Sequence, residues 1–269
     1  MSQKILIKGA GEQASAVAHR LYQCGFRVAM TEQERPTAVR RRVAFCSALY
    51  NGDVIIEGVK GVKKSLADTA FLSAFDWPFI PVFIDPAGSL KNQWQPDVIV
   101  DARILKKNLD TTMSDAPLTI ALGPGFTAGE DVHVVIETNR GHHLGRMIRE
   151  GSADKNTGIP GAIGGYTGER VLRAPADGVF TAVRGIGDLI NAGDVVGSVC
   201  GIHITAGIAG VIRGLCYPGL VVKKGQKMGD IDPRGDVSYC DTISDKARTI
   251  SGSVLEVVVG FFSGHKGRV

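Results

Sequence analysis

The chain has 269 residues, of which 44% are hydrophobic and 22% are charged, as is usual for a globular protein of about two domains. The formal net charge of +4 is too small to require a nucleic acid or an anionic membrane as a partner. The five cysteines are odd in number, widely spaced and form no CxxC pair, so neither a disulfide framework nor a structural zinc site is predicted. No apolar run reaches membrane-spanning length, and no secretory segment precedes the first strand, so we expect a cytoplasmic protein.

The first 32 residues predict a strand, a glycine-rich turn, a helix and a second strand. Gly9, Gly11 and Ala14 follow the opening KILIK run with the spacing G-x-G-x-x-A, and the second strand ends at Glu32. In dinucleotide-binding sites such glycines let the backbone approach phosphate, the helix N-terminus offers N–H groups, and the acid binds a ribose hydroxyl. The stretch therefore predicts a bound nucleotide or nucleotide-bearing cofactor, although Glu12 would bring negative charge close to its phosphate.

The chain up to about residue 150 continues with alternating strand and helix patterns. Helices are predicted over 36–49 and 65–75, and strands over 53–59, 79–84, 97–101, 118–122 and 132–137. Near-continuous apolar strands between helices are typical of a parallel sheet with both faces covered. The predicted fold class is therefore α/β, with a Rossmann-like, mostly parallel sheet over residues 1–150.

Polar or glycine-rich residues follow several of these strands, where ligands of parallel sheets lie. One crevice is therefore predicted, and its expected lining beyond the first glycine turn is Asp85, Asp101, Arg103, Gly123, Gly125, Asn139 and Arg140. The cofactor-binding candidates are Gly9, Gly11, Ala14, Glu32, Gly123, Gly125, Asn139 and Arg140. His142, Asp101 and Arg103 are candidates for catalysis, the alternatives being a solvent-facing histidine and a salt bridge that holds a loop. No metal site is predicted, because the adjacent His142 and His143 point in different directions.

The segment 174–231 is one unit written twice. Its copies, 174–199 and 206–231, align without a gap, and their glycines coincide at four positions. Two such copies bury their apolar faces against each other, which predicts a small all-β barrel of short strands over residues 171–235. Residues 151–170 are the predicted linker into it. Residues 236–269 are expected to pack on one of the domains, with 252–262 as a final apolar helix or strand.

The paired pattern APADGVF and GDVVG resembles the biotinyl/lipoyl hammerhead, also called the barrel-sandwich hybrid. Carriers of that kind present a lysine on the hairpin that joins the two halves. Here the joining segment, residues 200–205, reads CGIHIT and has no lysine. Neither biotin nor lipoate is therefore expected, and the resemblance favours a structural or docking role.

Five longer segments, among them IKGAGEQASAVAHRLYQCGFRVAMTE and LGPGFTAGEDVHVVIETNRGHHLGR, resemble the YqeB-type family. That family is associated with the selenium-dependent molybdenum hydroxylase system and is distantly similar to the XdhC-like accessory proteins, which have a Rossmann domain. The resemblance covers essentially the whole chain. It implies an accessory role in maturing a molybdenum hydroxylase, with a hydroxylase subunit as partner and the molybdenum cofactor as the small anionic ligand.

Two other functions stay open. An NAD(P)-dependent oxidoreductase fits the glycine turn, and Glu32 would favour NAD, but no group stands out as the acid or base of hydride transfer. A non-enzymatic adaptor that docks a hydroxylase through the doubled unit fits the missing lysine. The sequence does not decide whether the chain is an enzyme, and it leaves homo-oligomers open.

Overall fold

The computed structural model describes residues 3–73, 77–158 and 160–264, which form two compact units. Unit 1 consists of Met1–Pro36, Ala44–Asn156 and Ile243–Val269, and unit 2 of Thr37–Val43 and Thr157–Thr242. The chain thus passes between the units four times, at 36–37, 43–44, 156–157 and 242–243. Unit 2 is inserted into unit 1 and does not simply follow it.

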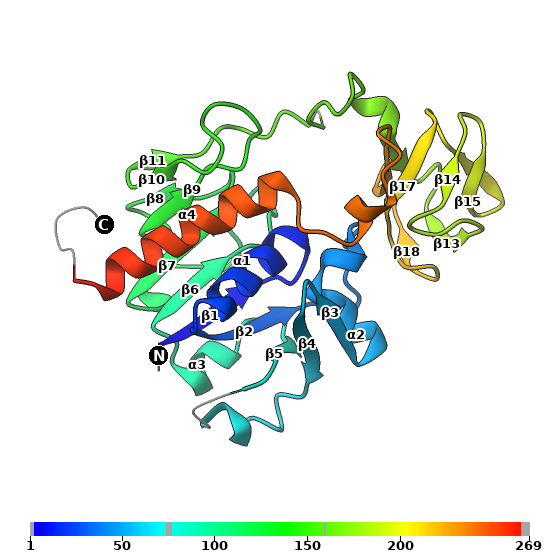
Figure 1. Ribbon diagram of the computed structural model, residues 1–269. Helices are drawn as coiled ribbons and strands as arrows, with labels where there is room; N and C mark the ends of the chain where they lie inside the picture. Colours follow the sequence, from blue (N-terminus) through cyan, green and yellow to red (C-terminus); the bar gives the residue numbers. More distant parts are fainter. Residues whose placement is uncertain (1–2, 74–76, 159, 265–269) are drawn as a thin grey trace. The chain divides into compact units, whose positions relative to one another are not determined.

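Unit 1 is built on a nine-stranded sheet (Figure 1). In spatial order its strands are β10 (Met147–Ile148), β9 (Val134–Ile136), β7 (Leu118–Leu122), β6 (Val98–Asp101), β1 (Lys4–Lys8), β2 (Arg27–Glu32), β5 (Ile80–Ile84), β4 (Val59–Lys64) and β3 (Asp53–Ile56). The strands from β9 to β4 run parallel, whereas β10 and β3 at the two edges are antiparallel to their neighbours. A separate antiparallel pair joins β8 (Thr127–Ala128) to β11 (Gly151–Ser152).

Two long helices, α1 (Glu12–Gln23) and α4 (Asp245–Phe262), pack against each other over one face of this sheet (Figure 1). Helix α1 ends where Gly25 adopts a φ of +83° and the Phe26 N–H donates to the Leu21 carbonyl. Helix α4 begins at Ser244, whose side chain accepts the N–H of Ala247 as an N-cap. Two short helices, α2 (Ala48–Asn51) and α3 (Leu90–Trp94), complete the unit.

The predicted fold class, a Rossmann-like sheet followed by a lipoyl-like barrel-sandwich hybrid, is wrong. The large sheet is mixed, and among the described residues only the β1–α1–β2 crossover contains a helix longer than five residues. The other crossovers run through loops, single turns or further strands, so the repeated helical covering of a doubly wound sheet is missing. The second unit consists of two four-stranded antiparallel sheets. Six parallel strands (β1, β2, β5, β6, β7 and β9) were predicted from the sequence, but the parallel strand β4 was missed and the predicted strand 53–59 corresponds to the antiparallel β3. The segments between the strands were not predicted correctly.

The two predicted helices over 36–49 and 65–75 account for much of that error. Thr37–Val43 belongs to unit 2, where the Leu215 N–H donates to the Val39 carbonyl and the Arg41 guanidinium donates to the Leu215 carbonyl. Within 65–75, the described residues contain only a single turn of 3₁₀ helix, Ala70–Ser73. Segment 36–49 contains two 3₁₀ turns, Arg41–Val43 and Phe45–Ser47, and the start of α2, but no continuous helix. Apolar periodicity does not distinguish such broken segments from one helix.

Unit 2 retains the duplication seen in the sequence. One sheet has the order β12 (Val171–Arg173), β19 (Lys227–Asp232), β17 (Gly210–Leu215), β14 (Leu189–Ile190), and the other β16 (Ile202–Thr205), β15 (Val195–Val199), β13 (Gly178–Ala182), β18 (Val221–Val222). Each copy gives its short middle strand to the other copy, since β14 pairs with β17 and β18 pairs with β13. Buried side chains of both copies form one core, which confirms that the copies bury their apolar faces together.

Candidate functional site

The first glycine turn has a closed inner side and an open outer side. Gly9 has a φ of +99°, and a Cβ there would lie 3.2 Å from the backbone of Ala102, so close packing against the neighbouring strand requires glycine. A Cβ at Gly11 would meet nothing within 4 Å. Ala14 is fully buried beneath the turn. Of the three predicted positions in this turn, Gly11 alone borders open space.

Glu32 closes the inner side of the turn. Its carboxylate accepts the N–H of Ala10 at 2.9 Å and the N–H of Gln33 at 2.8 Å. Burial raises the pKa of Glu32, against the opposing effect of these two hydrogen bonds. The Ala10 carbonyl in turn accepts the N–H of Cys46 at 2.9 Å. The acid predicted to hold a ribose therefore binds the turn itself.

The outer side of the turn lies beside the amino end of α4. The Ser244 hydroxyl donates to the Glu12 carboxylate at 2.9 Å, and Arg140 forms a two-pronged ion pair with Asp245 at 2.7 and 3.0 Å. Lys246 is half-buried between these groups and has no hydrogen-bond or ion-pair partner among the described residues. Burial and the neighbouring Arg140 lower the pKa of Lys246. The structure thus brings Gly11 and Arg140 into one region.

Asp101 and Arg103 form a closed charge network at the ends of β1 and β6. The Arg103 guanidinium donates to Asp101 at 2.6 and 3.1 Å and to Asp110 at 2.6 Å, and the buried Lys8 ammonium donates to Asp110 at 2.6 Å. Thr111 donates to Asp101 at 2.7 Å. Burial alone would raise the pKa of Asp110, but the hydrogen bonds from Arg103 and Lys8 outweigh it and hold that pKa at about 2. Two of the three catalytic candidates, Asp101 and Arg103, therefore hold the loop that follows β6.

The remaining candidates serve packing or face solvent. A Cβ at Gly123 would strike the side chain of Thr138, and one at Gly125, where φ is +104°, would strike the backbone of Lys107. The backbone N–H of Asn139 donates to Glu137 at 2.6 Å, and its side-chain amide donates to Asp154 at 3.3 Å. His142 and His143 are exposed. Asp85, also placed in the predicted crevice, caps α3 by accepting the N–H groups of Ser89 and Leu90.

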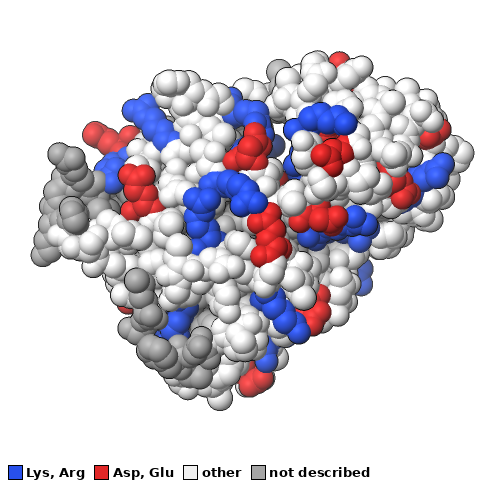
Figure 2. Space-filling model, in the orientation of Figure 1, with Lys and Arg blue, Asp and Glu red and all other residues white. Residues whose placement is uncertain are grey.

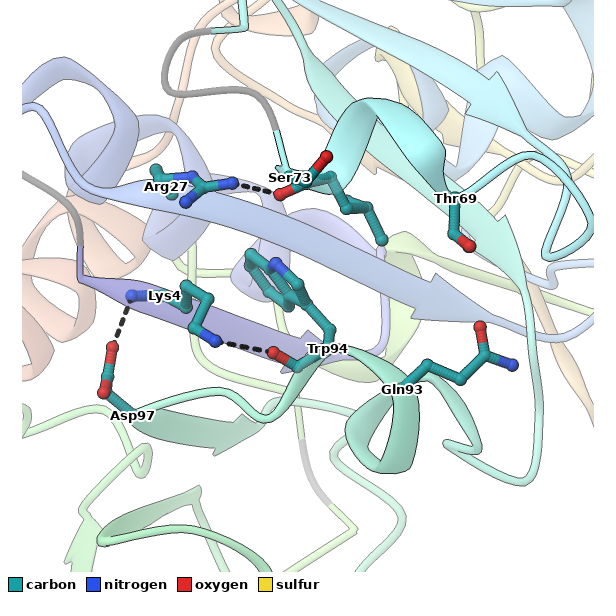
Figure 3. A pocket seen from close by; sticks show the side chains of 8 residues that line it. Lys4, Arg27, Thr69, Ser73, Gln93, Trp94 and Asp97 are labelled. Carbon is teal, nitrogen blue, oxygen red and sulfur yellow. Dashed lines mark hydrogen bonds between the residues drawn. The ribbon is translucent and has the colours of Figure 1, made fainter.

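A cavity of about 590 Å³ opens at the other end of the parallel strands, where β1 and β2 begin (Figure 3). It is lined by Lys4, Arg27, Thr69, Leu72, Ser73, Gln93, Trp94 and Asp97. Our sequence-based prediction missed this cavity because it placed ligands only beyond the carboxyl ends of strands. The sequence feature that could have indicated the cavity is its tryptophans, of which the chain has only two. Trp94 lines the cavity, and its ring centroid lies 5.6 Å from that of Trp77.

Three other kinds of feature would indicate a function: a charged surface patch, a membrane-spanning helix and a metal site. On the face drawn in Figure 2, basic and acidic side chains alternate and neither sign forms a continuous patch. In the part of the chain that the structure describes, no helix has both the length and the apolar character to cross a membrane. Within the same residues, no three His, Cys, Asp or Glu side chains cluster so as to hold a metal ion.

Comparison with known proteins identifies one close relative. The chain is similar to the uncharacterized protein YqeB of Escherichia coli (strain K12), with 48% identity over 257 residues. The match covers 96% of this chain and 47% of YqeB, so the chain spans about half the length of the curated relative. This chain is therefore homologous to a part of YqeB. No protein-family model matches the sequence.

Solved structures give only remote likenesses. An aspartoacylase family protein from Mesorhizobium loti has a TM-score of 0.28 and 13% identity, with 86% of this chain and 85% of that chain covered. A succinylglutamate desuccinylase/aspartoacylase from Rhodobacter sphaeroides has a TM-score of 0.27 and 13% identity, with the same coverage. Likeness at this level assigns neither a fold nor an activity to the chain.

Proposed function

We propose that this chain is an accessory protein in the maturation of a selenium-dependent molybdenum hydroxylase, and that unit 1 holds a phosphate-bearing ligand such as the molybdenum cofactor or a nucleotide. The observation on which the proposal rests is the open space on the outer side of Gly11. Lys246 lies beside it, and its ammonium group has no partner among the described residues. Similarity to YqeB over nearly the whole chain supports the YqeB resemblance, and the accessory role is what that resemblance implies.

The geometry favours a ligand on the outer side of the turn. Glu32 already binds the Ala10 amide on the inner side, so a phosphate is left with the first-turn amides of α1. Lys246 would neutralise part of the phosphate charge. Because its pKa is lowered by burial, binding of an anion would raise that pKa again, and binding should take up a proton and strengthen as pH falls.

The test is a calorimetric titration of the full chain with NAD⁺ and with a molybdopterin nucleotide at two pH values. Gly11→Asp should abolish binding, because it fills the open space and adds negative charge. Lys246→Gln should weaken binding about tenfold. Lys60→Gln is the matched control, since Lys60 pairs with Asp53 on the edge hairpin of the sheet. No heat at high micromolar ligand, or equal binding by Gly11→Asp, would exclude this site.

A second candidate, an adaptor that docks a hydroxylase subunit through unit 2, is favoured by exposed apolar side chains. Val179 and Val221 are both more than half exposed and lie directly opposite each other in the pairing of β13 with β18. Val179→Glu together with Val221→Glu should abolish co-purification of a hydroxylase subunit and leave the ligand titration unchanged. Co-purification that survives both substitutions would exclude this docking surface.

A further inference from the structure

We infer that the cavity at the amino ends of β1 and β2 binds a small organic anion, a carboxylate attached to a flat apolar body. The cavity lies entirely within unit 1. Its volume of about 590 Å³ is within the range of small-molecule sites. It is separate from the proposed cofactor site, because Lys4 and the Gly9 turn stand at opposite ends of strand β1, roughly 15 Å apart.

The walls of the cavity carry more hydrogen-bond donors than acceptors (Figure 3). One arm of the Arg27 guanidinium donates to the Leu72 carbonyl, whereas its buried Nε has no partner among the described residues. The indole N–H of Trp94 is likewise buried with no partner in the part of the chain that the structure describes, and the whole residue is only 6% exposed. Both residues line the cavity, and these two unpaired donors beneath its surface favour a ligand that supplies acceptor oxygens there.

Charge in the cavity points the same way. Lys4 and Arg27 contribute two positive charges, and Asp97 contributes one negative charge. One oxygen of Asp97 is occupied by the backbone N–H of Lys4 at 2.8 Å, and the Lys4 ammonium donates to the Trp94 carbonyl at 2.7 Å. The planar Arg27 guanidinium, with its remaining N–H groups, matches a carboxylate better than a spherical ion.

Aromatic surface supplies the apolar part of the site. The rings of Trp94 and Trp77 have centroids 5.6 Å apart, and the Arg27 guanidinium carbon lies 5.0 Å from the Trp77 ring centroid. Leu72 is buried next to them. A flat apolar body can therefore contact the small exposed part of Trp94 while its carboxylate meets Arg27.

The two tryptophans make the experiment specific to this cavity. They are the only tryptophans in the sequence, so the indole region of a ¹H–¹⁵N correlation spectrum holds two cross-peaks. The Trp77 indole donates to the Phe71 carbonyl at 3.1 Å, whereas that of Trp94 has no partner within residues 3–73, 77–158 and 160–264. Titration of the full chain with benzoate should move the Trp94 peak and leave the Trp77 peak nearly fixed. Benzamide and inorganic phosphate, which lack the charge and the flat body respectively, should move neither.

Three variants complete the test. Arg27→Gln should weaken benzoate binding about tenfold, because it removes the charged donor. Asp97→Asn should strengthen it, since a repelling charge is lost while an acceptor for the Lys4 N–H is kept, and a gain of affinity is not a result of misfolding. Lys60→Gln on the edge hairpin is the charge-matched control and should have no effect.

Four results would overturn the inference. These are the absence of a Trp94 shift at millimolar benzoate, equal binding of benzamide, equal binding of phosphate, and a benzoate affinity that neither Arg27→Gln nor Asp97→Asn changes. A Trp94 shift with benzoate alone, weakened in Arg27→Gln and enhanced in Asp97→Asn, would establish the site. Failure here would leave the proposed cofactor site untouched, because the two titrations use different ligands and different variants.

Discussion

Several residues of unit 1 that match a ligand-binding motif instead hold the polypeptide together. Glu32 binds the Ala10 amide, and Asp101 binds Arg103 and Thr111. Gly125 lets one loop pack on the backbone of Lys107. A carboxylate or glycine after a strand can therefore bind a ligand or stabilise the neighbouring loop. A carboxylate that already accepts hydrogen bonds from neighbouring groups of the protein has the second role.

Asp110 offers a test of the charge network at the residue scale. Its pKa of about 2 lies below the ordinary value, so its ionised form stabilises the folded state above that ordinary value, and this contribution is lost as pH falls toward 2. Asp110→Asn should lower the free energy of unfolding at pH 7 by about 1 kcal/mol, because solvent screens a carboxylate that is 38% exposed. Urea denaturation at pH 7, 4 and 2.5 should show the difference from the unsubstituted protein shrinking toward the lowest pH.

The control for that prediction is Asp53→Asn, which removes an exposed carboxylate with one exposed partner, Lys60. It should change stability less than Asp110→Asn at every pH. A difference between Asp110→Asn and the unsubstituted protein that stays constant from pH 7 to 2.5 would contradict the network described for Lys8, Arg103 and Asp110.

At the scale of elements, strands were more predictable than the segments between them. The runs at 4–8, 97–101 and 118–122 were read from short apolar β-rich sequence, and each lies in the central part of the sheet. Residues 36–49 have similar apolar content, but Val39 and Arg41 form hydrogen bonds with Leu215, far away in the sequence. Local periodicity carries no information about such long-range contacts. The cavity at Trp94 was missed for the same reason, because residues 4, 27, 72 and 94 meet only in the folded chain.

Helix α4 is expected to stabilise unit 1 mainly through its buried face. Val254 is fully buried in that face, whereas Val259 is 47% exposed on the same helix. Val254→Ala should reduce the free energy of unfolding by roughly 2 kcal/mol, from lost apolar burial and the cavity left behind. Val259→Ala is the matched control and should change it by less than about 0.5 kcal/mol. Equal effects in thermal and urea denaturation would show that the helix does not pack through Val254.

At the scale of the whole molecule, the duplicated segment and the inserted segment together make unit 2. The exchange of β14 and β18 between copies means that neither copy completes a four-stranded sheet alone. Thr37–Val43, distant in sequence, adds backbone and guanidinium hydrogen bonds to Leu215 and Tyr239. A boundary drawn at residues 171–235 from the repeat alone does not contain that segment.

A fragment experiment tests the contribution of the inserted segment. Residues 157–242 should unfold at lower urea concentration by themselves than when residues 37–43 are joined to them through a Gly-Ser linker. The expected difference is about 1 to 2 kcal/mol, because the segment contributes several hydrogen bonds, of about 1 kcal/mol each, minus its ordering entropy. A linked segment in which Val39 and Arg40 are replaced by glycine is the control. If all three proteins unfold at the same urea concentration, the segment is not part of unit 2.

The four crossings of the chain also impose an order on synthesis. The apolar face of α1 is covered by α4, which follows unit 2 in the chain. At ordinary translation rates, the 106 residues from 156 to 262 take on the order of 5 to 20 seconds to emerge. Throughout that interval the face of α1 that α4 covers stays uncovered, while the residues of unit 2 are still being made. Ribosome-associated chaperones are therefore expected to hold the growing chain until this eighteen-residue helix leaves the exit tunnel.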